Sequence, residues 1–212
     1  MDRKGRFITF EGGEGCGKST QTRLLADFLS ASGREVLLVR EPGGTGLGES
    51  IRSILKAKGG DEPCDRAELF LFLAARAQLV EKVLKPALEE GKWIVCDRFF
   101  DSTVAYQGYG RGMDIAQILA ANSFACAGLR PDVTFLLDLD LDAARNRMRG
   151  REAATNTEAD RIELAGDGFH SRLRQGFLDL ASKEPERIKV IDASRSVDEI
   201  ADEIRAKLDW TI

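Results

Sequence analysis

The sequence has few of the residues on which several kinds of active site depend. It contains one histidine, His170, which lies in a helical pattern with Leu173 and Phe177 and is interpreted as structural. Its four cysteines stand far apart, at positions 16, 64, 96 and 126, without a C-x-x-C pair. This spacing argues against a zinc site or a disulfide framework, and it fits a reducing compartment. We therefore expect a cytoplasmic protein.

Long apolar runs and an excess of positive charge are also missing. No apolar run approaches the ~20 residues that span a bilayer. The charged segment Met1–Arg6 leads straight into the first expected strand, which leaves no room for a signal peptide. The formal net charge of −4 argues against a non-specific nucleic-acid binder. We expect neither a membrane nor a nucleic acid as a partner.

Short apolar runs alternate with longer helical patterns along the 212 residues. This alternation predicts an α/β domain built on a parallel sheet. The expected strands are 6–11, 35–40, 92–97, 133–138 and 188–192. Ligands of such sheets bind beyond the carboxyl ends of the strands. The residues that follow each strand are therefore the first candidates for a functional site.

A glycine-rich stretch follows the first expected strand. Gly12, Gly17, Lys18 and Ser19 match the spacing G-x-x-x-x-G-K-[ST] of a phosphate-binding loop. A strand before the motif and a helix from Lys18 onward provide the context that it requires. The loop N–H groups and the positive end of the helix can bind phosphates, Lys18 can reach the outer phosphates, and Ser19 can ligate Mg²⁺. The motif predicts a triphosphate site.

A long helical pattern runs from Asp65 to about Glu90. Phe72 and Arg76 are four residues apart in it, so both project from one face. A ring beside a guanidinium can hold a planar nucleobase; alternatively, Phe72 is a core residue and Arg76 caps the surface. Apolar residues run nearly all round this helix, so we expect it to be buried on more than one side, and a subunit interface is one way to achieve this.

The residues after the second and third expected strands are further candidates. The loop 40–48, with its Pro-Gly-Gly turn signal, is either a connector or part of the site rim. Asp97 can hold Mg²⁺, directly or through water, or it can cap the next helix. Arg98 is a phosphate candidate because its planar fork matches phosphate oxygens. Helical spacing then places Thr103, Tyr106 and Gln107 on one face.

The most basic stretch has an arginine at every second position from 145 to 151, and a polar, loop-like segment follows it. An arginine-rich segment in an acidic protein suits a mobile lid that closes on phosphates, here residues 147–163. A solvated helix face is the alternative, because charge runs usually have that role.

The order of these motifs resembles that of the thymidylate kinases. The matching segments are Phe-Glu-Gly-Gly-Glu-Gly-Cys-Gly-Lys-Ser, Arg-Glu-Pro-Gly-Gly-Thr, Phe-Leu-Ala-Ala-Arg, Asp-Arg-Phe and Asp-Arg-Ile-Glu. The resemblance implies one kinase domain over residues 1–212, with three layers, a five-stranded parallel sheet flanked by helices, and a mobile lid. It also implies γ-phosphoryl transfer from ATP to dTMP with Mg²⁺, in a homodimer that makes dTDP for dTTP synthesis.

The resemblance assigns donor-side roles to the phosphate loop. The residues that would hold the ATP phosphates are Gly12, Gly13, Glu14, Gly15, Cys16, Gly17, Lys18, Ser19 and Thr20. Ser19 and Asp97 would serve the metal. This loop has no arginine, whereas the later segment has Arg147, Arg149, Arg151 and Arg161. That division is similar to the common bacterial type, in which the lid supplies arginines. The implied catalytic residues are Lys18, Arg98, Arg151 and Arg161.

The resemblance also assigns acceptor-side roles, which fall on residues of four segments: Glu14, Pro42, Phe72, Arg76, Arg98, Thr103, Tyr106 and Gln107. Glu14 would meet the sugar 3′-hydroxyl, and Tyr106 would crowd the 2′ position. Phe72 would stack on thymine beside Pro42, and Arg76 would donate to a thymine carbonyl oxygen. Arg98 would grip the dTMP phosphate, and Thr103 and Gln107 are weaker base contacts.

Two other functions fit parts of the pattern. A kinase for another nucleoside monophosphate would share the phosphate loop and the lid and would differ only around the base. A nucleotide-binding regulatory switch would need a guanine-specific motif such as N-K-x-D, which we do not find.

Overall fold

The computed structural model describes residues 5–155 and 165–208, without the side chains of residues 151–155. The five expected strands are confirmed, each within one residue of the predicted bounds. They are β1 (Phe7–Glu11), β2 (Val36–Arg40), β3 (Trp93–Asp97), β4 (Val133–Asp138) and β5 (Ile188–Asp192). All pairings are parallel, in the order β2-β3-β1-β4-β5. The central position of β1 places the phosphate loop at the middle of the sheet edge.

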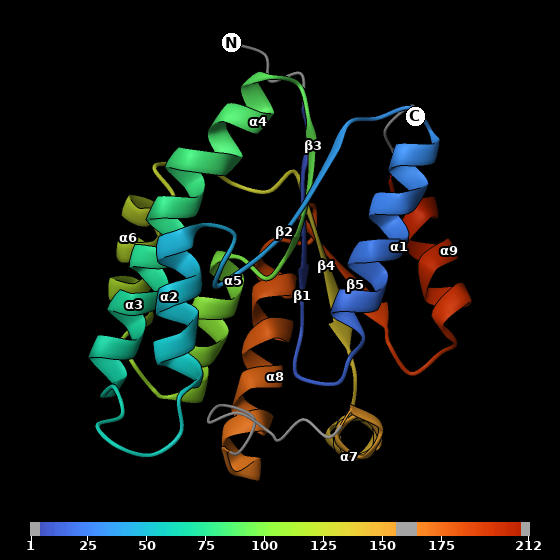
Figure 1. Cartoon of the computed structure of the whole chain (residues 1–212). Helices are drawn as coiled ribbons and strands as arrows, with labels where there is room; N and C mark the ends of the chain where they lie inside the picture. The colour runs from blue at the N-terminus through green and yellow to red at the C-terminus, as the bar shows by residue number, and fades with distance from the viewer. Residues whose placement is uncertain (1–4, 156–164, 209–212) are drawn as a thin grey trace.

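Helices cover both faces of the sheet (Figure 1). On one face lie α1 (Lys18–Ala31) and α9 (Val197–Ala206), which contact each other. The opposite face is covered by α3 (Asp65–Leu79), α4 (Lys85–Glu89) and α8 (Asp167–Lys183). The result is the three-layer α/β arrangement that the alternating pattern predicts. Across the described residues, none of the helices combines the length and apolarity that crossing a membrane requires.

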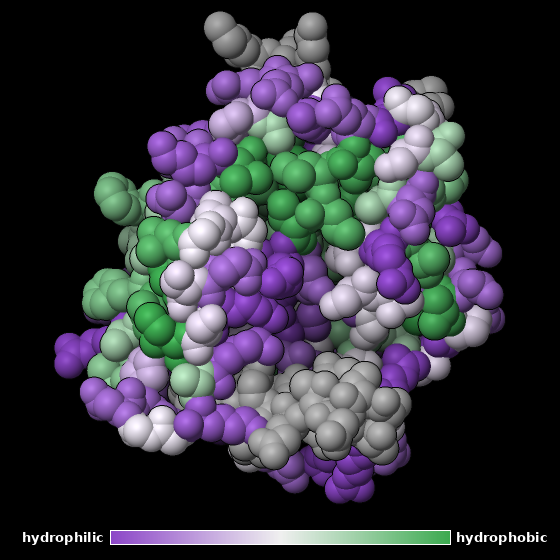
Figure 2. Space-filling model, in the orientation of Figure 1, coloured by the Kyte–Doolittle hydropathy of each residue, from purple (hydrophilic) through white to green (hydrophobic). Residues whose placement is uncertain are grey.

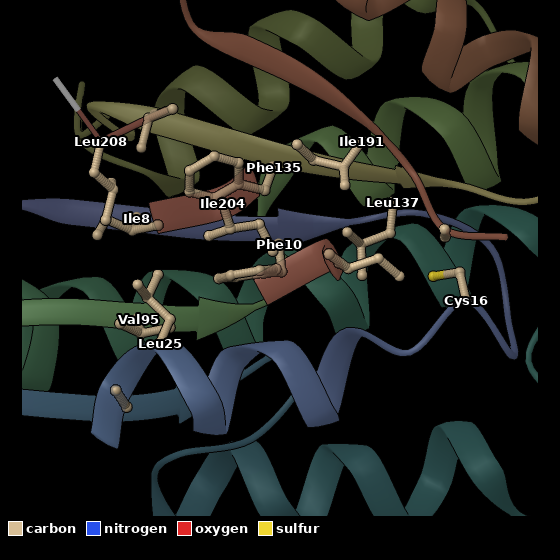
Figure 3. Packing of buried hydrophobic residues seen from close by; sticks show 14 of the residues in the cluster. Ile8, Phe10, Cys16, Leu25, Val95, Phe135, Leu137, Ile191, Ile204 and Leu208 are labelled. Carbon is tan, nitrogen blue, oxygen red and sulfur yellow. The ribbon is translucent and has the colours of Figure 1, made fainter. Parts of the chain in front are cut away.

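The alternation of side chains along β1 divides the core into two layers. Ile8 and Phe10 point toward α1 and pack with Leu25 and Phe135 (Figure 3). Phe7 belongs to the other layer, where its ring lies 4.9 Å from that of Phe99. Phe7, Ile8 and Phe10 are fully buried, as expected for the central strand of a parallel sheet with helices on each face. The buried strands give the loops at their carboxyl ends a rigid base.

Two helices contain a widened turn. The long helix expected from Asp65 is present, but η1 (Val80–Leu84), a π-helical turn, joins α3 to α4. A second π-helical segment, η2 (Val104–Gly110), continues the short helix α5 (Phe100–Thr103). Such turns are frequent at functional sites, and η2 carries Tyr106 and Gln107. The remaining helices are α2 (Gly46–Lys56), α6 (Ile115–Ala125) and α7 (Leu141–Thr155).

Candidate active site

A cleft of about 420 Å³ lies at the carboxyl ends of β1, β2 and β3. Its wall is formed by the loops that follow these strands and by side chains of α2, α3, α5, η2 and α7. In the space-filling view, hydrophilic side chains gather around a hollow at the centre of the face (Figure 2). This is where ligands bind in open parallel sheets.

The phosphate loop forms one side of the cleft. Gly17 precedes α1 in the left-handed conformation and, as a glycine, has no side chain to cap the helix. The N–H groups at the start of the helix can therefore meet an anion. Gly12 has a φ of 138° and lies so close to the Leu137 carbonyl that an added Cβ would be 2.5 Å from it. The buried Lys18 Nζ donates to the Gly12 and Gly13 oxygens, at 3.1 and 2.7 Å.

The nine phosphate-loop residues line two neighbouring hollows, and Glu14 borders both. Six of them line the 420 Å³ cleft: Glu14, Gly15, Gly17, Lys18, Ser19 and Thr20. Gly12, Gly13 and Cys16 line a second pocket of about 360 Å³, which Arg149 and His170 also border. The His170 ring lies edge-on to Phe169, and its structural role stays a prediction.

Ser19 and Asp97 lie together although they are 78 residues apart. The Ser19 hydroxyl donates to Asp97 Oδ2 at 2.7 Å. Because α5 begins after Phe99, Asp97 does not cap that helix. A hydroxyl beside a carboxylate is a donor set that suits Mg²⁺, which prefers hard oxygen ligands. The described residues contain no cluster of three or more His, Cys, Asp or Glu that could hold a metal, so a cation here would also need phosphate oxygens.

Arg98 and Tyr106 form a connected group with Glu14 of the phosphate loop. Arg98 has a φ of 72° and donates to the Gly12 carbonyl at 3.0 Å and to Glu14 Oε1 at 2.5 Å. The Tyr106 hydroxyl donates to the same Glu14 oxygen at 2.9 Å. Burial raises the pKa of Tyr106 well above its usual value, so this hydroxyl keeps its proton. The group ties the phosphate loop to η2.

Phe72 and Arg76 both reach the cleft from α3, and Pro42 faces it from the loop after β2. The alternative of Arg76 as a surface cap is wrong, because only 1 % of this residue is exposed. All five of its N–H groups donate to protein oxygens, which belong to Glu41, Phe99, Thr103 and Asn122. A direct bond from Arg76 to a base would therefore require one of these partners to be exchanged.

The loop 40–48 is part of the site rim rather than a mere connector. Its Glu41 forms a buried ion pair with Arg76 at 2.6 Å. Burial raises the pKa of Glu41, although the Arg76 charge opposes this. Arg40 and Arg52 add positive charge to the lining of the cleft, together with Lys56 of α2.

Three carboxylates that support the site were missed in the sequence. Glu11 accepts from the backbone N–H groups of Phe99 and Ser102, at 2.8 and 3.2 Å, and from the Ser102 hydroxyl at 2.5 Å. Burial, and then the nearby Asp101, raise the pKa of Glu11 to about 7. The sequence signal that could have indicated Glu11 is an acidic residue at the end of an otherwise apolar strand. Glu41 was likewise visible as an acid beside Pro42.

Glu68 is the third. It lies four residues before Phe72, on the same face of α3 as Phe72 and Arg76, which is the spacing that could have indicated it. Only 1 % of Glu68 is exposed, and it accepts hydrogen bonds from Gln107 and Arg111. It thus connects α3 to Gln107 of η2 and to Arg111.

The arginine-rich stretch begins as part of α7. Arg147 lines the cleft beside Met148. Arg145 instead pairs with Asp142 and Asp167, at 3.5 and 2.6 Å. The side chain of Arg151, the residues 156–163 of the expected lid and Arg161 lie outside the described part of the chain. Their predicted roles stay predictions.

Comparison with known proteins agrees with this geometry. The family model described as Thymidylate kinase matches residues 10–204. The thymidylate kinase of Clavibacter sepedonicus is 50 % identical, over 96 % of this chain and 94 % of that protein. The thymidylate kinase of an Exiguobacterium species is 46 % identical, over 98 % of this chain and 94 % of its own length. A crystal structure of thymidylate kinase from Ehrlichia chaffeensis superposes with a TM-score of 0.77 at 37 % identity, covering 97 % of this chain and 99 % of that one. By sequence and by structure, the chain belongs to the thymidylate kinase family.

Proposed function

We propose that this protein transfers the γ-phosphoryl group of ATP to dTMP, forming ADP and dTDP for dTTP synthesis. One observation carries the proposal: the phosphate loop and the wall that contains Phe72, Arg76 and Gln107 open onto the same cleft. A donor triphosphate and an acceptor nucleotide can therefore meet there. The family relationship supports the choice of substrates.

On the donor side, the backbone N–H groups of residues 12–20 hold the ATP phosphates. Lys18 leaves the Gly12 and Gly13 carbonyls, which it contacts now, and turns to the β- and γ-phosphates. Ser19 and Asp97 would hold Mg²⁺, directly or through water. When bound, Mg²⁺ would neutralise charge on the transferring phosphoryl group.

On the acceptor side, Phe72 stacks on thymine, and Pro42 closes the pocket beside it. Arg98 binds the dTMP phosphate, because its guanidinium faces the cleft next to the phosphate loop. Glu14 accepts from the 3′-hydroxyl. The Tyr106 ring, only 6 % exposed, leaves little space at the 2′ position and so disfavours ribonucleotides.

The reaction needs alignment rather than a general base. A phosphate oxygen of dTMP is ionised near neutral pH, and it forms the new bond to Pγ while the bond from Pγ to the bridging oxygen of ADP breaks. The side chains lower the barrier by positioning these atoms in line and by neutralising charge in a loose transition state. Lys18 and Arg98 supply positive charge, and the lid arginines Arg151 and Arg161 add to it.

The substrate assignment is tested by ADP release in a coupled assay with ATP, Mg²⁺ and a panel of acceptors: dTMP, dUMP, dCMP, dGMP and AMP. Strong stimulation by dTMP supports the proposal. A stronger response to another monophosphate would point to a different acceptor. Slow hydrolysis that is indifferent to every acceptor would support the regulatory switch.

We also propose that the enzyme is a cytoplasmic homodimer that binds small molecules only. The support is an apolar flank formed by α3 and α6, which lie side by side (Figures 1 and 2). On it, Phe70 is 66 % exposed, Leu119 48 % and Phe124 90 %. Large apolar side chains with such exposure are typical of a surface that a partner covers.

A further inference from the structure

Gln107 is a neutral residue on the wall of the cleft. The Glu68 carboxylate behind it determines how its side-chain amide is oriented. Gln107 lies in η2, lines the cleft and is 2 % exposed. Its Nε2 donates to Glu68 Oε1 at 2.9 Å. Arg111 also donates to Glu68, from Nε to Oε1 at 2.7 Å and from Nη2 to Oε2 at 2.8 Å. Asp65 provides a second carboxylate, 3.3 Å from Arg111 Nη1.

These contacts fix which end of the Gln107 amide faces inward. A carboxylate held on both oxygens by a guanidinium has no proton to donate, so only the NH₂ end of an amide can face it. The amide oxygen Oε1 is then directed away from Glu68. Within the described residues, no donor reaches this oxygen, and the space that Gln107 borders is the cleft. Gln107 therefore offers a hydrogen-bond acceptor to a ligand.

The neighbouring Thr103 has the opposite hydrogen-bonding role, that of a donor. It lies four residues earlier and lines the same wall. Arg76 Nη1 donates to Thr103 Oγ1 at 2.9 Å. Because a guanidinium only donates, the Thr103 hydroxyl hydrogen must point elsewhere. The wall thus presents a hydroxyl donor beside an amide acceptor. The buried Arg76–Glu41 pair holds the first in its role, and the partly buried Arg111–Glu68 pair holds the second.

We propose that Glu68 is a positioning residue that sets the pyrimidine selectivity of the acceptor pocket. The inference rests on the proposed function. Thymine and uracil carry a carbonyl acceptor at position 4 and an N–H donor at position 3, which complement Thr103 and Gln107. Cytosine carries an amino donor at position 4 and an unprotonated N3 acceptor, the reverse pattern. Binding cytosine would leave buried polar groups unpaired, and such mismatches give large discrimination.

The test is the ratio of kcat/KM for dTMP to that for dCMP in the full-length protein and in Glu68→Gln. A glutamine at position 68 can offer either end of its amide, so the Gln107 amide is free to rotate by 180° and donate to cytosine N3. We expect a wild-type ratio of about 10³ or more. In the variant we expect it to fall by roughly 10- to 100-fold. The ratio for dTMP to dUMP stays unchanged, because both bases have N3–H.

A merely structural role for Glu68 would lower turnover with dTMP and dCMP together and leave their ratio as it is. A ratio within twofold of wild type in Glu68→Gln would therefore overturn the inference. Asp65→Asn is the matched control: it removes a partner of Arg111 but leaves Glu68 on Gln107, so the ratio is retained. If wild-type protein phosphorylates no pyrimidine monophosphate, the proposed function fails instead, which this assay reports separately.

A second variant tests the inference even if Glu68→Gln does not fold. The double substitution Glu68→Met with Arg111→Met removes both charges of the ion pair and keeps side-chain volume, a change that buried pairs tolerate. It too releases the Gln107 amide, so the dTMP to dCMP ratio falls by roughly the same factor. An undiminished ratio in this variant also contradicts the role of Glu68.

Discussion

Lys18 shows how one residue serves two states of the phosphate loop. In this structure its ammonium group is held by carbonyl oxygens of its own loop, a position that triphosphate oxygens would take over. Replacement by alanine removes the positive charge that Lys18 places beside the transferring phosphoryl group. We expect turnover of Lys18→Ala to fall by about 10³-fold.

Thermal unfolding followed by circular dichroism provides the control for Lys18→Ala. The lysine makes only hydrogen bonds to the loop, so we expect the Tm to change by only a few degrees. Steady-state turnover with ATP and dTMP then reports the chemical role alone. Near-normal turnover in this variant would disprove the phosphate-loop assignment.

Glu11 predicts a dependence of stability on pH. Its pKa is raised to about 7 in the folded protein, from 4.5. The folded state therefore binds more protons than the unfolded state between these values, and the free energy of unfolding falls as pH rises through this window. Glutamine mimics the protonated form. We expect Glu11→Gln to gain up to about 3 kcal/mol relative to wild type between pH 4.5 and pH 8.

Urea unfolding of wild type and Glu11→Gln across that range measures the difference. Ser102 can rotate its hydroxyl to accept from the new amide, while Phe99 N–H still donates to the remaining oxygen, so the variant should fold. Parallel stability curves for the two proteins would show that Glu11 is ionised throughout and would contradict the prediction.

At the scale of residues, the sequence predicted the side chains that face the cleft better than the buried carboxylates that hold those side chains in place. The phosphate-loop spacing and the pair Phe72 and Arg76 are local patterns, readable from one segment. The partners of the buried charges are not local: Glu41 lies 35 residues from Arg76, and Glu11 lies 91 residues from Ser102. Such pairs depend on the order of strands in the sheet, which no single segment encodes.

At the scale of elements, the strands were predicted well because each is a short, mostly apolar run between turn signals. The central strands β1, β3 and β4 are buried almost throughout, whereas the edge strands β2 and β5 are only partly buried. The π-helical turns were not predicted. Their i to i+5 hydrogen bonds have no apolar spacing of their own, and tertiary packing determines where they form. In η2 that packing comes from α8, whose Gly176 lies against the Tyr109 ring.

This contact predicts a defect that spreads from α8 to the site. A Cβ at position 176 would lie 2.6 Å from Tyr109 Cγ, so Gly176→Ala must displace η2 or α8. We expect a loss of about 1–3 kcal/mol in the free energy of unfolding. We also expect a higher KM for dTMP, because η2 carries Tyr106 and Gln107. Urea unfolding and steady-state kinetics measure the two effects.

Gly168→Ala is the matched control on the same helix. A Cβ there would meet only Arg172 Nη1, at 3.4 Å. Alanine also has a higher helix propensity than glycine by about 1 kcal/mol, so this variant should be at least as stable as wild type with an unchanged KM. Equal behaviour of the two variants would show that the packing of η2 against α8 does not shape the site.

At the scale of the whole molecule, the apolar flank of α3 and α6 is the surface that the proposed dimer would cover. Helix α3 holds Phe72 and Arg76 in the cleft on one side and exposes Phe70 on the other. If a second copy covers this flank, α3 is clamped between the interface and the base pocket. Dimerisation would then stabilise the acceptor site as well as the fold.

A substitution on that flank tests this arrangement. Phe124, at the end of α6, is 90 % exposed, and a stable interface buries roughly 800 Å² on each partner around a few aromatic anchors. We expect wild-type protein to sediment as a dimer and Phe124→Glu to weaken the dimer by at least about 30-fold. Val197→Glu is the control, because Val197 is a 49 % exposed apolar residue on α9, on the opposite side of the sheet. A monomeric wild type, or an equal effect of both variants in analytical ultracentrifugation, would mean that another surface or no surface mediates assembly.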